Sequence, residues 1–321
     1  MSEIKSQMEG VLYGIAIGDA LGVPVEFISR NELKKNPVTE MKGGGTHHQP
    51  AGTWSDDTAL SLCLAECIAA GFDLDDLARR FINWQNFGYM TALGETFDIG
   101  MTTQSAISNL ESGIKPALSG DDSERSNGNG SLMRILPLIF LIKNYSIEDR
   151  FDAVRMVSSI THAHMRSVAC CFIYIEYALR LMNGENKFSA FEELRNAIPN
   201  WLQSKVKDAE ELKFFGRIFS EQFHTISENE ILSSGYALHT LEASLWCFLN
   251  SDDYESCVLK AVNLGDDTDT TGAVAGGLAG LYYGISGIPD KWIEKLSGKN
   301  LIDEVISHLH NSMEQETHPP K

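Results

Sequence analysis

Two short segments of the chain crowd carboxylates and hydroxyl side chains together. Residues 265–272 read GDDTDTTG and residues 52–58 read GTWSDDT, and each segment comes just before a run of helix-forming residues. A single Asp, Ser or Thr is enough to cap the first turn of a helix, so the additional acids need another explanation. Hard cations such as Mg²⁺ and Mn²⁺ prefer oxygen ligands from carboxylates, hydroxyls and water. If the two segments meet in space, they can bind divalent cations between them.

In the first segment, Asp267 and Asp269 fall in one tight turn with the hydroxyl of Thr270 beside them. Ordinary acidic helix starts remain the alternative for each segment alone, because carboxylates in a first turn interact favourably with the helix dipole. Doubled acids in both segments favour the metal site. An EF-hand calcium loop is excluded, because its twelfth position would be Leu278 instead of a bidentate glutamate.

Two further acids lie near the start of the chain, in the segment GIAIGDALGVPVEF. Asp19 falls on the apolar stripe of a predicted helix, and a buried carboxylate requires partners. It can cap a neighbouring helix, or it can orient a metal-ligating side chain without binding the metal itself. Glu26 follows Pro24 closely, and taken alone it is expected to be an acid of a surface loop.

Glycines and amides occur together in residues 126–131, with the sequence SNGNGS, just before an apolar segment. Exposed backbone N–H groups at such a point suit a phosphate, although an ordinary capped loop has the same composition. Residues 161–164 read THAH. Histidines two residues apart suggest a metal, but a turn at a helix end explains them equally well, and we predict no zinc site there.

The elements that position these residues are predicted to be helices, because apolar residues recur with helical periodicity and alternating strand patterns are nearly absent. The first helix carries an apolar stripe that includes Met8, Val11, Leu12 and Ile15. The whole pattern predicts an all-α fold, a single domain of a dozen or more helices over residues 1–312, followed by a frayed tail over residues 313–321. Residues 42–53 and 112–131 are expected to be functional loops. The other predicted helices are about 57–70, 75–89, 131–143, 148–160, 165–183, 188–204, 208–222, 237–249, 253–263, 269–284, 290–297 and 300–312.

The composition limits the classes of partner. Lys plus Arg number 26 against 44 Asp plus Glu, a net charge of −18, which argues against nucleic acids and anionic membranes as partners. Six cysteines without a CxxC pair favour a reducing compartment. No signal-peptide core and no apolar run of membrane-spanning length is apparent, so a soluble, cytoplasmic protein is expected. The oligomeric state is left open.

Seven segments, in order along most of the chain, resemble the ADP-ribosylglycohydrolase family. The SDDT and GDDTDTTGA blocks are the most specific of them, and the resemblance is strong over residues 10–180 and 235–285 but thin over 185–234. The matching segments are GIAIGDALGVPVEF, GGGTHHQPAGTWSDDTAL, FDIGMTT, NGNGSLMRILPL, THAH, GYALHTLEASLW and NLGDDTDTTGAVAGGLAGLYYG.

The resemblance implies an orthogonal helix bundle with two Mg²⁺ or Mn²⁺ ions in a cleft. It further implies an enzyme that hydrolyses a glycosidic bond and releases mono-ADP-ribose from a protein side chain, with arginine the first expectation for the linkage and serine its main rival. A serine stands at position 55 where the family usually has threonine, which keeps the oxygen ligand. By resemblance, the metal ligands are Ser55, Asp56, Asp57, Asp267, Asp269 and Thr270; the catalytic candidates are Asp98, Asp56 and Glu26; and the substrate-binding candidates are Ser126, Gly128, Asn129, Gly130 and His162.

The expected chemistry passes through an oxocarbenium-like state at the ribose anomeric carbon. Two metals can hold the adjacent ribose hydroxyls and orient a water, while Asp98 or Asp56 moves protons. Two alternatives remain: another dinuclear-metal hydrolase acting on a phosphate ester or nucleotide derivative, and a non-catalytic ADP-ribose-binding or structural relative. Intact acids at positions 56, 57, 267 and 269 argue against a degenerate site.

Overall fold

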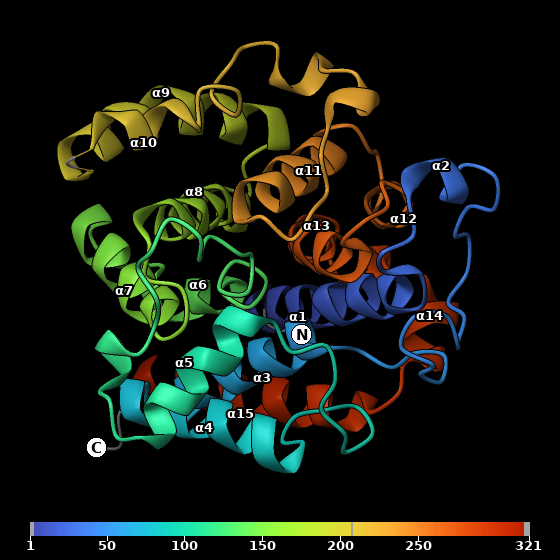
Figure 1. The fold of residues 1–321 in the computed structure, drawn as a ribbon, viewed down its shortest axis with the longest axis horizontal. Helices are drawn as coiled ribbons and strands as arrows, with labels where there is room; N and C mark the ends of the chain where they lie inside the picture. Colours follow the sequence, from blue (N-terminus) through green and yellow to red (C-terminus); the bar gives the residue numbers. More distant parts are fainter. Residues whose placement is uncertain (1–2, 207, 318–321) are drawn as a thin grey trace.

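Helices make up nearly the whole ordered structure. The computed structural model describes residues 3–206 and 208–317, and within these ranges it contains fifteen α-helices, several short 3-10 turns and no β-sheet, which confirms the all-α prediction. Figure 1 shows α1 and α13 side by side in the middle of the molecule, with the other helices around them. The helices are α1 (Glu3–Gly22), α2 (Arg30–Leu33), α3 (Asp56–Ala69), α4 (Leu74–Phe87), α5 (Met101–Glu111), α6 (Ile139–Ile142), α7 (Ile147–Ser159), α8 (Met165–Met182), α9 (Lys187–Lys205), α10 (Ala209–Lys213), α11 (Ala237–Leu249), α12 (Tyr254–Val262), α13 (Thr268–Tyr283), α14 (Asp290–Lys295) and α15 (Lys299–Thr317).

The central pair α1 and α13 is antiparallel, and the two backbones touch along a column of glycines. A Cβ atom added at Gly14 would lie 2.4 Å from the carbonyl oxygen of Gly276, and one added at Gly276 would lie 2.3 Å from that of Gly14. Residues four apart in a helix share one face, so Gly10 and Gly18 repeat this contact one turn away on either side, against Gly280 and Gly272. The small residues of α13 therefore allow the two helices to pack at close range.

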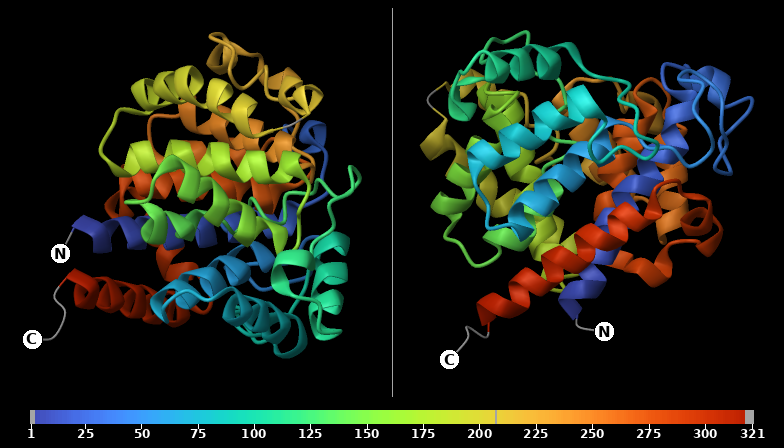
Figure 2. Two further views of the ribbon diagram at one scale, coloured as in Figure 1. Left: turned by 90° about the vertical axis from the view of Figure 1, so that its left-hand side faces the viewer. Right: turned by 90° about the horizontal axis from the view of Figure 1, so that it is seen from below.

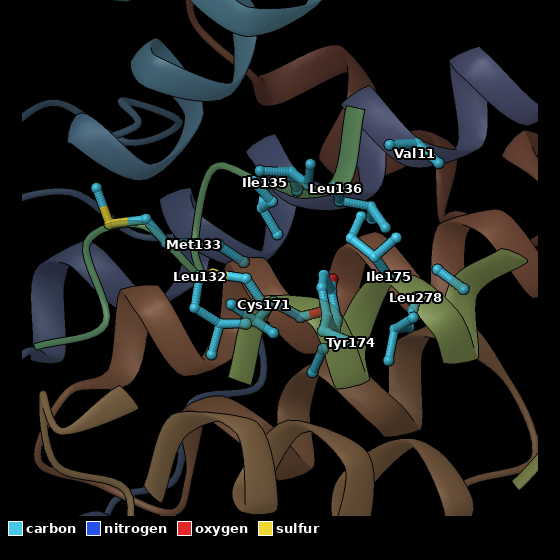
Figure 3. Packing of buried hydrophobic residues seen from close by; sticks show 14 of the residues in the cluster. Val11, Leu132, Met133, Ile135, Leu136, Cys171, Tyr174, Ile175 and Leu278 are labelled. Atoms are coloured by element: carbon cyan, nitrogen blue, oxygen red, sulfur yellow. The ribbon is translucent and has the colours of Figure 1, made fainter. Parts of the chain in front are cut away.

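An apolar core surrounds this pair. Figure 3 shows Val11 of α1, Leu136, Ile175 of α8 and Leu278 of α13 within one cluster of side chains. The hydroxyl of Tyr174 donates to the carbonyl oxygen of Val274 at 2.8 Å, which satisfies a polar group inside the core. Helix α15 packs against α1 and α3, and Figure 2 shows the start of α1 and the end of α15 on the same side of the molecule.

Among the described residues, one helix, Glu3–Val25, is long and apolar enough to span a membrane by length and composition. The expectation that no apolar run reaches that length was therefore wrong. Most of this stretch, 83% of its apolar window, is buried inside the protein. Burial on all sides explains a helix that is apolar all round.

Several predicted boundaries also need correction. The predicted helix 208–222 shortens to α10, because Phe and Gly residues that follow Lys213 are poor helix formers. The predicted helix 131–143 begins as turns, and Pro137 lies in a 3-10 turn, Leu136–Leu138, that precedes α6. The tail expected from residue 313 is helical through Thr317, and residues 318–321 lie outside the described residues.

Candidate metal and substrate site

The N-terminus of α3 is capped by Asp19 of α1. Both carboxylate oxygens of Asp19 accept from the backbone N–H of Ser55, at 2.9 and 3.0 Å, and one also accepts from the N–H and hydroxyl of Thr58, at 3.1 and 2.6 Å. Asp19 is fully buried, and burial raises its pKa to about 6. Because Asp19 satisfies the helix start, the side chains of Asp56 and Asp57 are not needed as helix caps.

The two acidic segments meet at the N-termini of α3 and α13. The hydroxyl of Ser55 donates to the carboxylate of Asp57 at 3.0 Å, and the hydroxyl of Thr270 donates to the same oxygen at 3.4 Å. Asp269 accepts from the backbone N–H of Thr270 at 2.9 Å. In addition, carboxylate oxygens of Asp19, Asp57 and Asp269 lie within 4.8 Å of one another.

Three buried carboxylate oxygens in this region have no hydrogen-bond partner among the described residues. They are Oδ1 of Asp57, Oδ1 of Asp267 and Oδ2 of Asp269. An unpartnered buried polar atom costs free energy, and a charged one costs more. Divalent cations bind carboxylate oxygens of this kind, so the donor set fits hard metal ions.

A second group of potential ligands adjoins the first. Ligand atoms of Glu26, His47, Asp98 and Asp269 lie within 4.8 Å of one another. Nε2 of His47 bonds to the carboxylate of Glu26 and lies 3.8 Å from Oδ1 of Asp98. Glu26 is only 4% exposed, so the expectation of a surface acid is corrected. We call Glu26, Asp56, Asp57, Asp98, Asp267 and Asp269 the acidic cluster.

Burial and mutual repulsion raise the pKa values of five carboxyls of the acidic cluster, those of Glu26, Asp56, Asp57, Asp267 and Asp269. Burial and the neighbouring carboxylates, Asp98 first among them, raise the pKa of Glu26 to about 10. Burial likewise raises the pKa values of Asp56, Asp57 and Asp269 well above the usual range of an aspartate, and nearby acids raise them further. Without a cation, the cluster therefore retains protons that a metal would have to displace.

The acidic cluster opens into a pocket of about 470 Å³ that α5 also borders. Gly100 precedes α5 without a side-chain cap, so the first N–H groups of the helix have no intrahelical partner and suit an anion. Sequence analysis missed α5. The lining residues include Glu26, Asp56, Asp98, Asp267 and Thr270, together with Phe27, Gly100, Met101, Thr102, Thr103, Gly128, Asn129, Gly130, His162 and Gly235.

The 126–131 loop meets α5 and His162 at this pocket. A Cβ atom at Gly130 would lie 2.8 Å from the His162 ring and 3.0 Å from the Thr103 hydroxyl. Asn129 lies deeper, and its amide donates to Asp267 and to Thr240, both at 2.9 Å. Glycine at position 130 therefore keeps space open between these polar groups.

Two of the predicted substrate-binding residues, Ser126 and His162, differ in their relation to the pocket. The hydroxyl of Ser126 donates to Asp121 at 2.7 Å and does not line the pocket. The two histidines of THAH separate, because His164 caps α8 while His162 lines the pocket. Burial and the Arg134 guanidinium lower the pKa of His162 to about 3, so its ring is neutral.

His47 is a candidate ligand that sequence analysis did not single out. Its loop was expected to be functional, but two adjacent histidines occur there, and nothing in their types shows which one faces the site. His48 has a positive φ of 55° and is exposed, whereas the ring of His47 reaches Glu26. The path of the loop backbone therefore determines that His47, and not His48, faces Glu26.

Comparisons with known proteins agree on one family. A family model described as ADP-ribosylglycohydrolase matches residues 1–319. ADP-ribosylarginine hydrolase Tri1 of Pseudomonas putida (strain GB-1) is 34% identical over 310 residues, which cover 96% of this chain and 78% of the relative. ADP-ribosyl-[dinitrogen reductase] glycohydrolase of Rhodospirillum rubrum is 31% identical over 295 residues, 90% of each chain. A solved structure, an ADP-ribosylglycohydrolase-related protein complex, matches with a TM-score of 0.76 at 30% identity and covers 97% of this chain and 99% of its own.

Proposed function

The chain belongs to the ADP-ribosylglycohydrolase family, and from that premise we propose that it releases mono-ADP-ribose from arginine side chains of proteins with the help of two divalent cations, Mg²⁺ or Mn²⁺. Membership makes it a hydrolase of glycosidic bonds. The relatives named for an arginine linkage, at 34% identity, support arginine as the modified residue. The relative named for dinitrogen reductase supports a protein substrate.

The observation that carries the metal proposal is the set of three unpartnered buried oxygens on Asp57, Asp267 and Asp269. These oxygens come from the two helix starts that hold the predicted ligands. When bound, divalent cations supply positive charge that polarises ribose hydroxyls and activates water. The proposed ligands are Ser55, Asp56, Asp57, Asp267, Asp269 and Thr270.

Two carboxyl groups of the chain are proposed to carry out the two proton transfers of the reaction. Water adds to the ribose anomeric carbon, the bond from that carbon to the guanidine nitrogen breaks, and the leaving nitrogen takes a proton. We assign Asp98, which lines the pocket with a positive φ of 58°, as the base that accepts the proton of water. We assign Glu26, which lines the same pocket, as the proton donor to the leaving group; Asp56 remains the alternative to either role.

The diphosphate of the substrate is proposed to lie between α5 and the 126–131 loop. The free N–H groups at the start of α5 donate to its oxygens. Gly128 and Gly130 let the backbone approach, and the neutral ring of His162 adds a polar contact without a charge. The Ser126 hydroxyl does not contact the diphosphate in this proposal, because it donates its hydrogen bond to Asp121.

The test is turnover of defined peptides that carry ADP-ribose on arginine or on serine, with Mg²⁺, Mn²⁺ or EDTA. Release from the arginine peptide with either metal, and loss of release in EDTA, is expected. Asp98→Asn should lower kcat by roughly 10²–10⁴-fold, the range of a general base. Release from serine alone would overturn the linkage, and metal-bound protein that binds ADP-ribose without releasing it from any peptide would show a non-catalytic relative.

A further inference from the structure

Phe27 is an unusual residue at the opening of the pocket. Its side chain is 69% exposed, and its backbone has a φ of 64°. A positive φ is strained for a bulky side chain, and an exposed aromatic ring gains little from burial. Folding alone therefore gives no reason for phenylalanine at this position.

The backbone around Phe27 explains the strain but not the ring. The N–H of Phe27 donates to the carbonyl of Asp266 at 2.7 Å, and the N–H of Asp266 donates to that of Ile28 at 2.9 Å. This pairing ties the loop after α1 to the segment before α13, and Asp266 also has a positive φ, 61°. Glycine would adopt the conformation at position 27 without strain, so the phenyl ring needs a separate purpose.

The ring belongs to an aromatic lip beside the acidic cluster, made of Phe27, His47 and Phe97. The Phe27 and His47 ring centroids are 6.3 Å apart, and those of His47 and Phe97 are 5.3 Å apart. His47 in turn bonds to Glu26, and Phe27 lines the same pocket as Glu26 and Asp98. A group at this lip meets an aromatic face and carboxylates together.

We propose that Phe27 binds the guanidinium of the modified arginine and so favours the arginine linkage over a hydroxyl linkage. This inference rests on the proposed function. A planar, delocalised cation stacks on an aromatic face and pairs with carboxylates, and the aliphatic stem of arginine covers the remaining apolar surface. A serine-linked substrate offers a neutral oxygen and a single methylene, so it gains little from the ring.

The test measures KM and kcat on the arginine-linked peptide, and Kd for free ADP-ribose, with Phe27→Ala, Phe27→Leu and Phe27→Trp. Alanine and leucine should raise KM about five- to tenfold, and tryptophan should keep KM near the wild-type value, because a cation needs the π face. The Kd for ADP-ribose should stay within about twofold, since the guanidinium is absent from it. Phe87→Ala is the matched control, because Phe87 is 77% exposed at the end of α4 and does not line the pocket.

An unchanged KM in Phe27→Ala, wild-type behaviour of Phe27→Leu, or an equal weakening of ADP-ribose binding would overturn the inference. The wild-type enzyme separates it from the proposed function. If wild-type protein cleaves the arginine peptide and the Phe27 variants match it, only the role of Phe27 fails. If wild-type protein cleaves only the serine peptide, the arginine assignment and the role of Phe27 fail together.

Discussion

Asp57, Asp267 and Asp269 each hold one buried carboxylate oxygen that no described residue satisfies, although hydroxyl, amide and N–H donors satisfy their other oxygens. A protein that needed these acids only as helix caps would not leave such atoms unpaired, because each one costs free energy. Asp19 makes the contrast clear, since it does cap a helix and uses both of its oxygens to do so. Asp19 has partners for both of its oxygens, whereas Asp57, Asp267 and Asp269 each leave one oxygen unpartnered, and this difference indicates a bound cation.

We predict that Asp269→Asn removes metal-dependent turnover and the metal-induced rise in Tm, while the Tm in EDTA increases. The amide oxygen can still accept from the N–H of Thr270, but one buried acid leaves the cluster. The expected increase is roughly 1–2 °C, equivalent to about 1 kcal/mol for a chain of this length. Thermal scans with and without Mn²⁺ check this. A variant that keeps the full Mn²⁺ shift would show that Asp269 is no ligand.

The raised pKa of Glu26 predicts how stability depends on pH. Its pKa is about 10 in the folded, metal-free protein and about 4 in an unfolded chain. Between these values the folded state binds more protons than the unfolded state, so its free energy of unfolding falls as pH rises. In EDTA, Tm should fall between pH 5.5 and 8.5, and the stabilisation by Mg²⁺ should grow over the same range, because the cation displaces protons. Parallel Tm curves with and without Mg²⁺ would contradict this account.

At the residue scale, the two acidic segments could be recognised from the sequence, because each contains more acids than a helix cap requires. The sequence did not identify His47 or Phe27. Their roles depend on a loop path and on positive φ angles at Phe27 and Asp98, and a sequence does not display these angles.

At the scale of elements, the glycine column between α1 and α13 positions the site. A Cβ atom at Gly22, the last residue of α1, would lie 2.3 Å from the Cα of Asp269, so the contact delivers the acids of both helices to one place. Apolar periodicity made α1, α13 and helices such as α11 predictable from sequence as single helices, but it did not show that α1 and α13 pair. Helix α5 was not predictable, because its buried stripe of Thr103, Ala106, Ile107 and Leu110 contains only two large apolar side chains.

We predict that Gly276→Ala destabilises the protein by about 1–3 kcal/mol, the usual cost of overpacking. Its new methyl would lie 2.3 Å from the carbonyl oxygen of Gly14, which cannot move without shifting α1. Affinity for Mn²⁺ should also fall, because α13 carries Asp269 of the cluster and Asp19 of α1 holds the start of α3, which carries Asp56 and Asp57. Urea unfolding and Mn²⁺ titration measure the two effects. Gly216→Ala is the control, since its Cβ would meet only an ordinary contact at 3.4 Å; equal losses in both variants would contradict the argument.

At the scale of the molecule, one core connects both ends of the chain, with α15 packed on α1 and α3. The site lies where the central helices start and end, so a ligand there should stabilise every part together. We predict one cooperative unfolding transition by calorimetry, which Mn²⁺ moves as a whole to higher temperature. Two transitions, of which Mn²⁺ moves only one, would contradict the single-domain prediction for residues 1–312.

Metal ions between the starts of α3 and α13 are the central feature of the proposed site. A crystal grown with Mn²⁺, and measured for anomalous scattering at a wavelength where manganese scatters strongly, locates such ions without reference to activity. The account predicts two anomalous peaks, held by Asp56 and Asp57 on one side and by Asp267 and Asp269 on the other. A map with no peak between these carboxylates, from protein saturated with Mn²⁺, would contradict it.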